Sequence, residues 1–139
     1  GRVLVQTLDP QHYSIDAARL QDYEKFVTME MEFRATPPYP PFSHIVNIIS
    51  SDESEDAAQM RLVKLSLAFQ QQIDRQGGGT EILGPVDCPL GRVKNKFRFH
   101  LMLRDRNRPR LHKVLSVYDQ LPREAKVGLI VDVDAMSLL

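Results

Sequence analysis

The chain has 139 residues, of which 42% are hydrophobic and 26% are charged, and its formal net charge at pH 7 is zero. This composition is typical of one ordinary globular domain and excludes a disordered polyelectrolyte. The single cysteine, Cys88, excludes an internal disulfide and a cysteine-rich zinc site, and no apolar run approaches the roughly 20 residues of a membrane span. We therefore expect no membrane partner.

The first 41 residues carry signals for a strand, a helix and a connector. Residues 3–5, VLV, are typical of a buried strand. Because the chain lacks an initial Met and would begin inside that strand, we expect a piece of a larger protein, the alternative being an expression remnant at Gly1. Residues 15–34 are predicted to form one helix, with Ser14 as a candidate N-cap. Residues 36–42, TPPYPPF, end it and are interpreted as a stiff connector rather than a polyproline ligand.

From residue 43 onward, strand and helix signals alternate. In chain order we predict a strand at 43–50, a helix to about Arg75, a glycine stop at 77–79, a strand at 80–85, a loop or irregular strand at 86–95, a strand at 96–104, a helix after Asn107 and a strand at 126–134. The first of these helices has Met60, Val63 and Leu67 on one stripe. The order β-α-β-β-α-β predicts an α+β sandwich, in which a four-stranded antiparallel sheet has two helices on one face.

Positive charge is concentrated in residues 91–110. This stretch holds eight of the 18 Lys and Arg residues and one acid, Asp105, so its charge is 8 − 1 = +7 and the remainder sums to −7. Side chains of a strand alternate between faces. One face therefore carries the core residues Phe97, Phe99, Leu101 and Leu103. The open face carries Lys96, Arg98, His100, Met102 and Arg104, with Arg92 and Lys94 before them and Arg106, Arg108 and Arg110 after them.

Three interpretations of this basic surface stay open. Clustered Lys and Arg are suited to neutralising phosphates, so one is contact with nucleic acid. The others are docking onto an acidic surface of the same larger protein and an ordinary solvated face. Since the aromatic rings face the core, nucleic acid would be bound along its backbone without sequence preference rather than by base stacking.

Other chemistry-bearing residues form no recognisable catalytic set. The four histidines share no metal-ligand spacing, and Cys88 has no obvious histidine partner. Asp132 and Asp134 form a D-x-D that could hold Mg²⁺, although two polar positions on a half-exposed strand end are the simpler interpretation. The chain has neither a G-x-x-x-x-G-K-[ST] phosphate loop nor a G-x-G-x-x-G motif. We therefore predict no enzyme activity and no bound cofactor for this stretch.

Several segments together resemble the C-terminal part of the primosomal protein N′ (PriA) family, bacterial helicases that restart stalled replication forks. These segments, which cover essentially the whole chain in order, are GRVLVQT, HYSIDAARLQDYEKF, YPPF, LGPVDCPLGRVKNKFRFHLMLR and VDVDAMSLL. The resemblance implies that residues 1–41 are the last strand of the second helicase lobe, a connecting helix and a Pro-rich linker. It implies that residues 42–139 are a C-terminal domain, similar in fold to a small-subunit ribosomal protein, that contacts DNA and partners.

The resemblance also implies properties of the parent protein. The parent would be an ATP-dependent 3′-to-5′ DNA helicase that uses Mg²⁺, binds zinc in a cysteine-rich insertion and acts in the bacterial cytoplasm, associated with the nucleoid. The implied partners are forked or single-stranded DNA, single-stranded DNA-binding protein and other primosome proteins. The alternative to DNA binding is a protein-interaction module that receives the acidic tail of single-stranded DNA-binding protein or docks onto the helicase core.

Two groups of site residues follow. The predicted DNA-binding residues are Arg92, Lys94, Lys96, Arg98, His100 and Arg104. For the acidic tail, residues 108–115, RPRLHKVL, resemble an R-x-R-L-Q-x-L pattern in a family member, whose Arg and Gln one turn apart receive the tail. Arg108 matches that Arg and His112 stands in place of the Gln, with Arg110 as a further candidate. Ala135 stands where the family commonly has Pro after D-V-D.

Overall fold

The computed structural model describes residues 1–135 and divides into two compact units, Gly1–Tyr39 and Pro40–Leu139. The predicted boundary, between residues 41 and 42, lies two residues further along the chain. That residues 1–41 belong to a helicase lobe stays a prediction.

The first unit contains two helices, α1 (Tyr13–Leu20) and α2 (Tyr23–Ala35), where the sequence predicted one over 15–34. The break falls at Gln21, which has a left-handed φ of 54°, and at Asp22, whose side chain accepts a hydrogen bond from the Lys25 N–H at 2.9 Å and so caps α2. The prediction of one helix is wrong because Asp22 fits the polar face of a continuous helix as well as it fits an N-cap.

The strand predicted at residues 3–5 does not form. These residues are exposed and have no regular structure. A strand is stabilised by hydrogen bonds to a neighbouring strand, and the described part of this unit offers none. Packing in this unit centres on Tyr13, whose ring stacks near Phe26 and Phe33 and whose hydroxyl donates to the Glu30 carboxylate.

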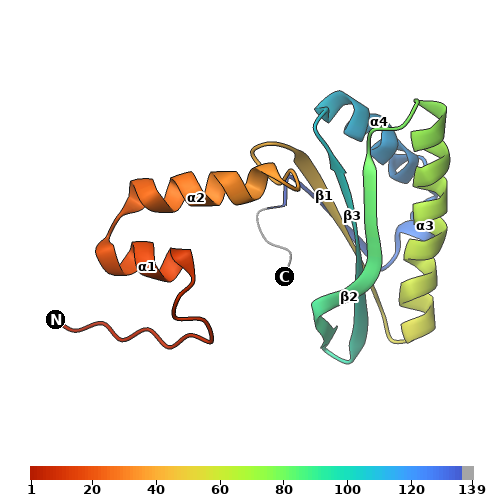
Figure 1. Cartoon of the computed structure of the whole chain (residues 1–139). Helices are drawn as coiled ribbons and strands as arrows, with labels where there is room; N and C mark the ends of the chain where they lie inside the picture. The colour runs from red at the N-terminus through yellow and green to blue at the C-terminus, as the bar shows by residue number, and fades with distance from the viewer. Residues whose placement is uncertain (136–139) are drawn as a thin grey trace. The chain divides into compact units, whose positions relative to one another are not determined.

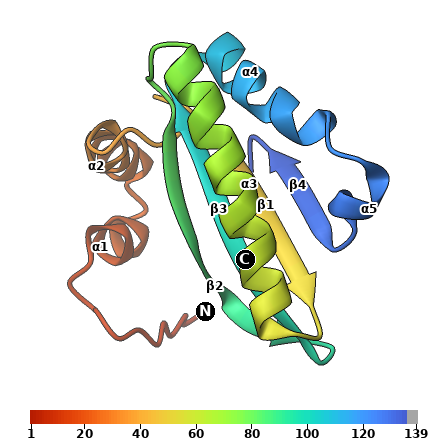
Figure 2. The ribbon, with the colours of Figure 1, turned by 90° about the vertical axis from the view of Figure 1, so that its right-hand side faces the viewer.

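The second unit is an open-faced α+β sandwich, which confirms the predicted fold class (Figure 1). Its elements in chain order are β1 (His44–Asp52), α3 (Glu55–Arg75), β2 (Glu81–Val93), β3 (Lys96–Asp105), α4 (Arg108–Asp119), α5 (Arg123–Lys126) and β4 (Leu129–Val133). The strands pair antiparallel in the order β2-β3-β1-β4. Helices α3 and α4 lie on the same face of the sheet (Figure 2).

Local signals explain where these elements begin. Ser54 caps α3, and Asn107 caps α4 by accepting from the Arg110 N–H at 2.9 Å, as predicted for Asn107. The segment 86–95, predicted as a loop or an irregular strand, extends β2 through two register shifts. Lys94 and Asn95 then form a two-residue turn into β3, both with positive φ, which suits the twist of a hairpin. The short helix α5 was not predicted.

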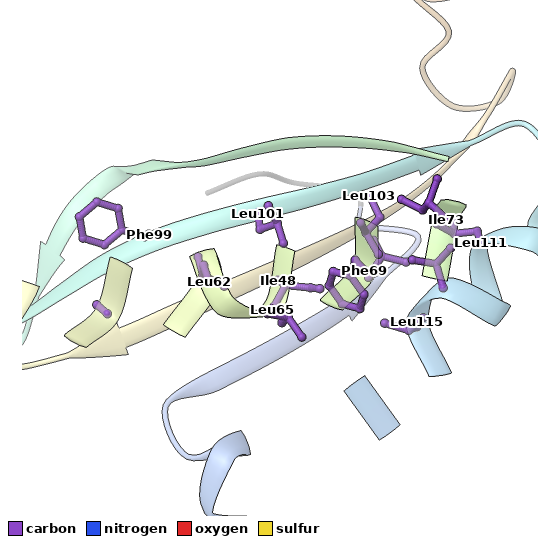
Figure 3. Close-up of a cluster of buried hydrophobic side chains, with 13 residues drawn as sticks. Ile48, Leu62, Leu65, Phe69, Ile73, Phe99, Leu101, Leu103, Leu111 and Leu115 are labelled. Atoms are coloured by element: carbon purple, nitrogen blue, oxygen red, sulfur yellow. The ribbon is translucent and has the colours of Figure 1, made fainter. Parts of the chain in front are cut away.

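The core lies between the sheet and α3 and α4 (Figure 3). From α3 it takes Ala58, Leu62, Leu65, Phe69 and Ile73. The predicted stripe is wrong, because Met60 is 50% exposed and Leu67 is 61% exposed. Both stripes have helical spacing, so the sequence alone did not decide which face of α3 meets β1 and β3.

Candidate nucleic-acid interface

The open face of the sheet is less cationic than the alternation predicted. Its middle is occupied by His100 and Met102 of β3, which lie beside apolar residues of the neighbouring strands: His100 pairs with Ile49 and Val86, and Met102 pairs with Leu83. Met102 and Ile49 are both buried. The alternation itself is confirmed, since Phe99, Leu101 and Leu103 are in the core cluster on the helix-covered face.

Arg104 is not a free cation of this face, although the alternation placed it there as one. Only 8% of it is exposed, and its Nε and Nη2 donate to the Glu81 carboxylate on the neighbouring strand at 3.2 and 2.5 Å. The guanidinium therefore links β3 to β2.

His100 lies where burial disfavours its charged form. Its ring is half-buried, and its Nδ1 is buried with no hydrogen-bond partner among residues 1–135. Burial lowers the pKa of His100 from its ordinary value of 6.5, because the charged imidazolium is poorly solvated there. The middle and far end of the strand face therefore present a histidine whose charged form is disfavoured and a paired arginine.

The remaining basic side chains of the hairpin gather at its closed end. We call residues 92–98 the hairpin tip; it carries Arg92, Lys94, Lys96 and Arg98. Lys96 pairs with Val93 and shares the open face with Arg98. Arg92 lies on the other face, where it pairs with Phe97, stands 4.9 Å from the centre of that ring and donates to the Asn95 side chain at 2.6 Å.

The tip cations have no carboxylate partner within the described part of the chain. None of the ion pairs formed among residues 1–135 includes Lys94, Lys96 or Arg98, whereas Arg104, Arg108 and Arg110 each contact an acidic side chain. The basic stretch therefore consists of cations that are neutralised internally and cations that are not.

Asp105, the single acid of the stretch, is the centre of the neutralised part. Its buried carboxylate accepts from the Thr80 hydroxyl at 2.6 Å, the Asn107 N–H at 2.7 Å, and Arg110 Nε and Nη2 at 2.7 and 2.6 Å. Arg110 also donates to the Gly79 carbonyl at 3.3 Å. Burial alone would raise the pKa of Asp105, but the hydrogen bonds from Arg110 and Thr80 outweigh it and lower the pKa below 3.8.

This network changes the interpretation of Arg110. Its guanidinium was predicted to receive a partner, but it joins the start of α4 to the end of β3 and to the glycine turn. The role of Asp105 was not predicted from the sequence. A signal was present, since one acid among eight basic residues suggests an internal partner.

Arg108 and His112 lie one turn apart on α4, and both are exposed. The Arg108 side chain is 58% exposed, and its Nη2 lies 3.7 Å from Asp134 Oδ2. The other carboxylate oxygen of Asp134 lies 3.5 Å from His44 Nδ1. Asp132 of the same D-x-D faces Asn47 in the sheet.

Other candidate chemistry is sparse in the described residues. Within 1–135, no group of three or more His, Cys, Asp or Glu side chains is placed to hold a metal ion. Cys88 is buried, and this burial raises the pKa of its thiol. In the same residues, no helix has the length and apolar character needed to cross a membrane.

Fold and surface together define a small α+β domain of the open-faced sandwich class, with an exposed cationic hairpin tip and a second exposed cation at a helix start. The family model of the Primosomal protein N C-terminal domain matches residues 36–136, and the chain belongs to this family. The resemblance predicted from the sequence is therefore confirmed. The matching family is a C-terminal domain rather than a helicase core, which agrees with the prediction that this stretch is not itself an enzyme.

Relatives from distant bacteria agree with this assignment. The chain is 27% identical to the replication restart protein PriA of Bacillus subtilis over 100% of its length, and 29% and 24% identical to those of Haemophilus influenzae and a Synechocystis species over 99%. It spans 17%, 19% and 16% of the length of these three relatives.

Proposed function

We propose that this chain binds forked or single-stranded DNA without sequence preference, through the hairpin tip, as part of replication restart. The observation that carries the proposal is that Lys94, Lys96 and Arg98 gather at one end of a hairpin with no carboxylate partner among residues 1–135. Cations without an internal partner are available to replace the counterions of a phosphate backbone.

The mode of binding follows from which side chains face outward. Lysine ammonium groups and the forked guanidinium of Arg98 suit phosphate oxygens, whereas Phe97 and Phe99 lie toward the helix-covered face and cannot stack on bases. His100 and Arg104 are not among the proposed contacts, because burial lowers the pKa of His100 and disfavours its charged form, and Arg104 is paired with Glu81. With four tip cations, we expect weak binding that depends steeply on salt.

Charge reversal at the tip tests the proposal. Lys96→Glu combined with Arg98→Glu is expected to abolish binding of the full chain to labelled forked and single-stranded DNA, measured by fluorescence anisotropy at low salt. The matched control combines Lys64→Glu with Arg123→Glu, which makes the same change in net charge at exposed positions outside the tip. If the tip variant binds as tightly as the unmodified chain, or if both variants lose binding equally, the tip is not the site.

A second candidate function is binding of the acidic tail of single-stranded DNA-binding protein. The favouring observation is that Arg108 and His112 are both exposed and one turn apart on α4, whereas Arg110 is held by Asp105. Arg108→Ala is expected to weaken binding of a labelled acidic peptide that ends in a free carboxylate, while Lys113→Ala on the same helix is not. Equal affinities for both variants would count against this function.

The remaining expectations concern the longer protein. We propose that helicase activity, with its ATP, Mg²⁺ and zinc, belongs to the parts of the relatives that this chain does not span, since the family match is to a C-terminal domain and the chain spans 17% of the Bacillus relative. Contact with other primosome proteins is proposed on the same basis.

A further inference from the structure

The carboxylate of Asp134 lies between two cationic or potentially cationic side chains from separate elements. One is Arg108 at the start of α4, at 3.7 Å, and the other is His44 at the start of β1, at 3.5 Å. The two contacts use different oxygens of the carboxylate. At these separations the two contacts are electrostatic rather than close hydrogen bonds.

The backbone fixes Asp134 in this position. Its N–H donates to the Ile45 carbonyl at 2.8 Å, and its φ of 56° is left-handed, so the chain turns directly after β4. Asp132, two residues earlier, pairs with Asn47 within the sheet. The turn therefore separates the two acids of the D-x-D: Asp134 is directed to Arg108 and His44, and Asp132 stays on the strand.

We propose that Arg108 and His44 form a carboxylate-binding site that the chain's own Asp134 fills, and that an acidic peptide binds there by displacing Asp134. This inference rests on the proposed partner function of Arg108. It adds His44 as a second ligand of the peptide and Asp134 as an internal competitor that lowers its affinity.

The contacts are suited to exchange. The Arg108, His44 and Asp134 side chains are 58%, 37% and 49% exposed, so water screens them and an incoming carboxylate can approach. Because exposed ion pairs contribute little to stability, we expect competition from Asp134 to weaken peptide binding only about two- to fivefold. A peptide with several carboxylates gains more contacts than the single Asp134 and can replace it.

Removing the internal carboxylate tests the proposal. We would titrate the full chain with a short labelled acidic peptide that ends in a free carboxylate. Asp134→Asn is expected to tighten binding about two- to fivefold, because the amide no longer competes as an anion. Asparagine tolerates left-handed φ as aspartate does, so the turn is retained. Asp132→Asn is the matched control, since it removes the same charge two residues earlier in the chain, within β4.

The outcomes separate this inference from the partner function. If Arg108→Ala leaves peptide affinity unchanged, the partner function itself fails. If Arg108→Ala weakens binding but Asp134→Asn tightens it no more than Asp132→Asn does, Asp134 is not the competitor and the inference is overturned. His44→Gln is expected to weaken binding, and unchanged affinity would remove His44 from the site. Far-ultraviolet circular dichroism of each variant checks that the fold is retained.

Discussion

Replacing Asp105 with alanine is expected to destabilise the second unit by about 3 kcal/mol. The carboxylate is fully buried and accepts four hydrogen bonds from Thr80, Asn107 and Arg110. In the variant, the buried Thr80 hydroxyl and the Asn107 N–H lose their acceptor, and the guanidinium loses its counterion. Breaking a buried ion pair from one side costs about 3–5 kcal/mol. We take the lower end, because the Arg110 side chain is 36% exposed and water can reach it.

Urea unfolding followed by circular dichroism measures this loss, with the exposed Asp132→Ala as a control expected to stay within about 0.5 kcal/mol. For a unit of this size, a loss of about 3 kcal/mol corresponds to a drop of roughly 12–24 °C in Tm. Because the folded-state pKa of Asp105 is lowered, its contribution is fully present above the unfolded value and is lost as the pH falls through the folded pKa. A loss below about 1 kcal/mol near neutral pH would refute the idea that this network holds α4 to the sheet.

Two further predictions test burial. Burial lowers the pKa of His100, so the unfolded chain binds a proton at this residue more readily than the folded chain does. The free energy of unfolding is therefore expected to fall as the pH drops below about 6.5, and His100→Gln is expected to remove part of that fall in a series of urea titrations. An unchanged pH dependence in this variant would contradict the assignment. Leu62→Ala is expected to cost about 3 kcal/mol and Leu67→Ala less than about 0.5 kcal/mol, and equal costs would mean that the buried face of α3 is misassigned.

The sequence was most informative where one pattern had one interpretation. The alternation of Phe97, Phe99, Leu101 and Leu103 places a strand with one core face, and the β-α-β-β-α-β order leaves few ways to arrange the sheet. Asn107 followed by Pro109 marks the start of α4 because each residue favours that position for a separate physical reason.

Errors arose where two interpretations satisfied the same local rule. Helical spacing fits both the Met60 and the Leu62 stripe of α3, and only packing against β1 and β3 decides between them. Asp22 suits a helix surface and an N-cap equally well. Residues 3–5 have strand composition, but a strand also needs a neighbour, and sequence composition does not say whether one is present.

For the candidate site, the sequence predicted which residues are basic but not which are neutralised. Arg104 and Arg98 lie on the same face of β3 and have the same intrinsic charge. Their difference comes from Glu81, which is 23 residues from Arg104 in sequence and directly opposite it across the β2–β3 pair. Whether Glu81 lies opposite Arg104 depends on the exact register of β2 against β3, and this register includes two shifts that no local sequence pattern specified.

The central claim is that the DNA-binding cations of the hairpin are those without an internal carboxylate partner, and the salt dependence of binding tests it most directly. For single-stranded DNA, four phosphate contacts predict a slope of about −3 in a plot of log K against log salt concentration. Lys96→Gln should reduce the magnitude of that slope by about 0.7, and Arg104→Gln should leave it unchanged. A slope that responds to Arg104→Gln and not to Lys96→Gln would contradict the account.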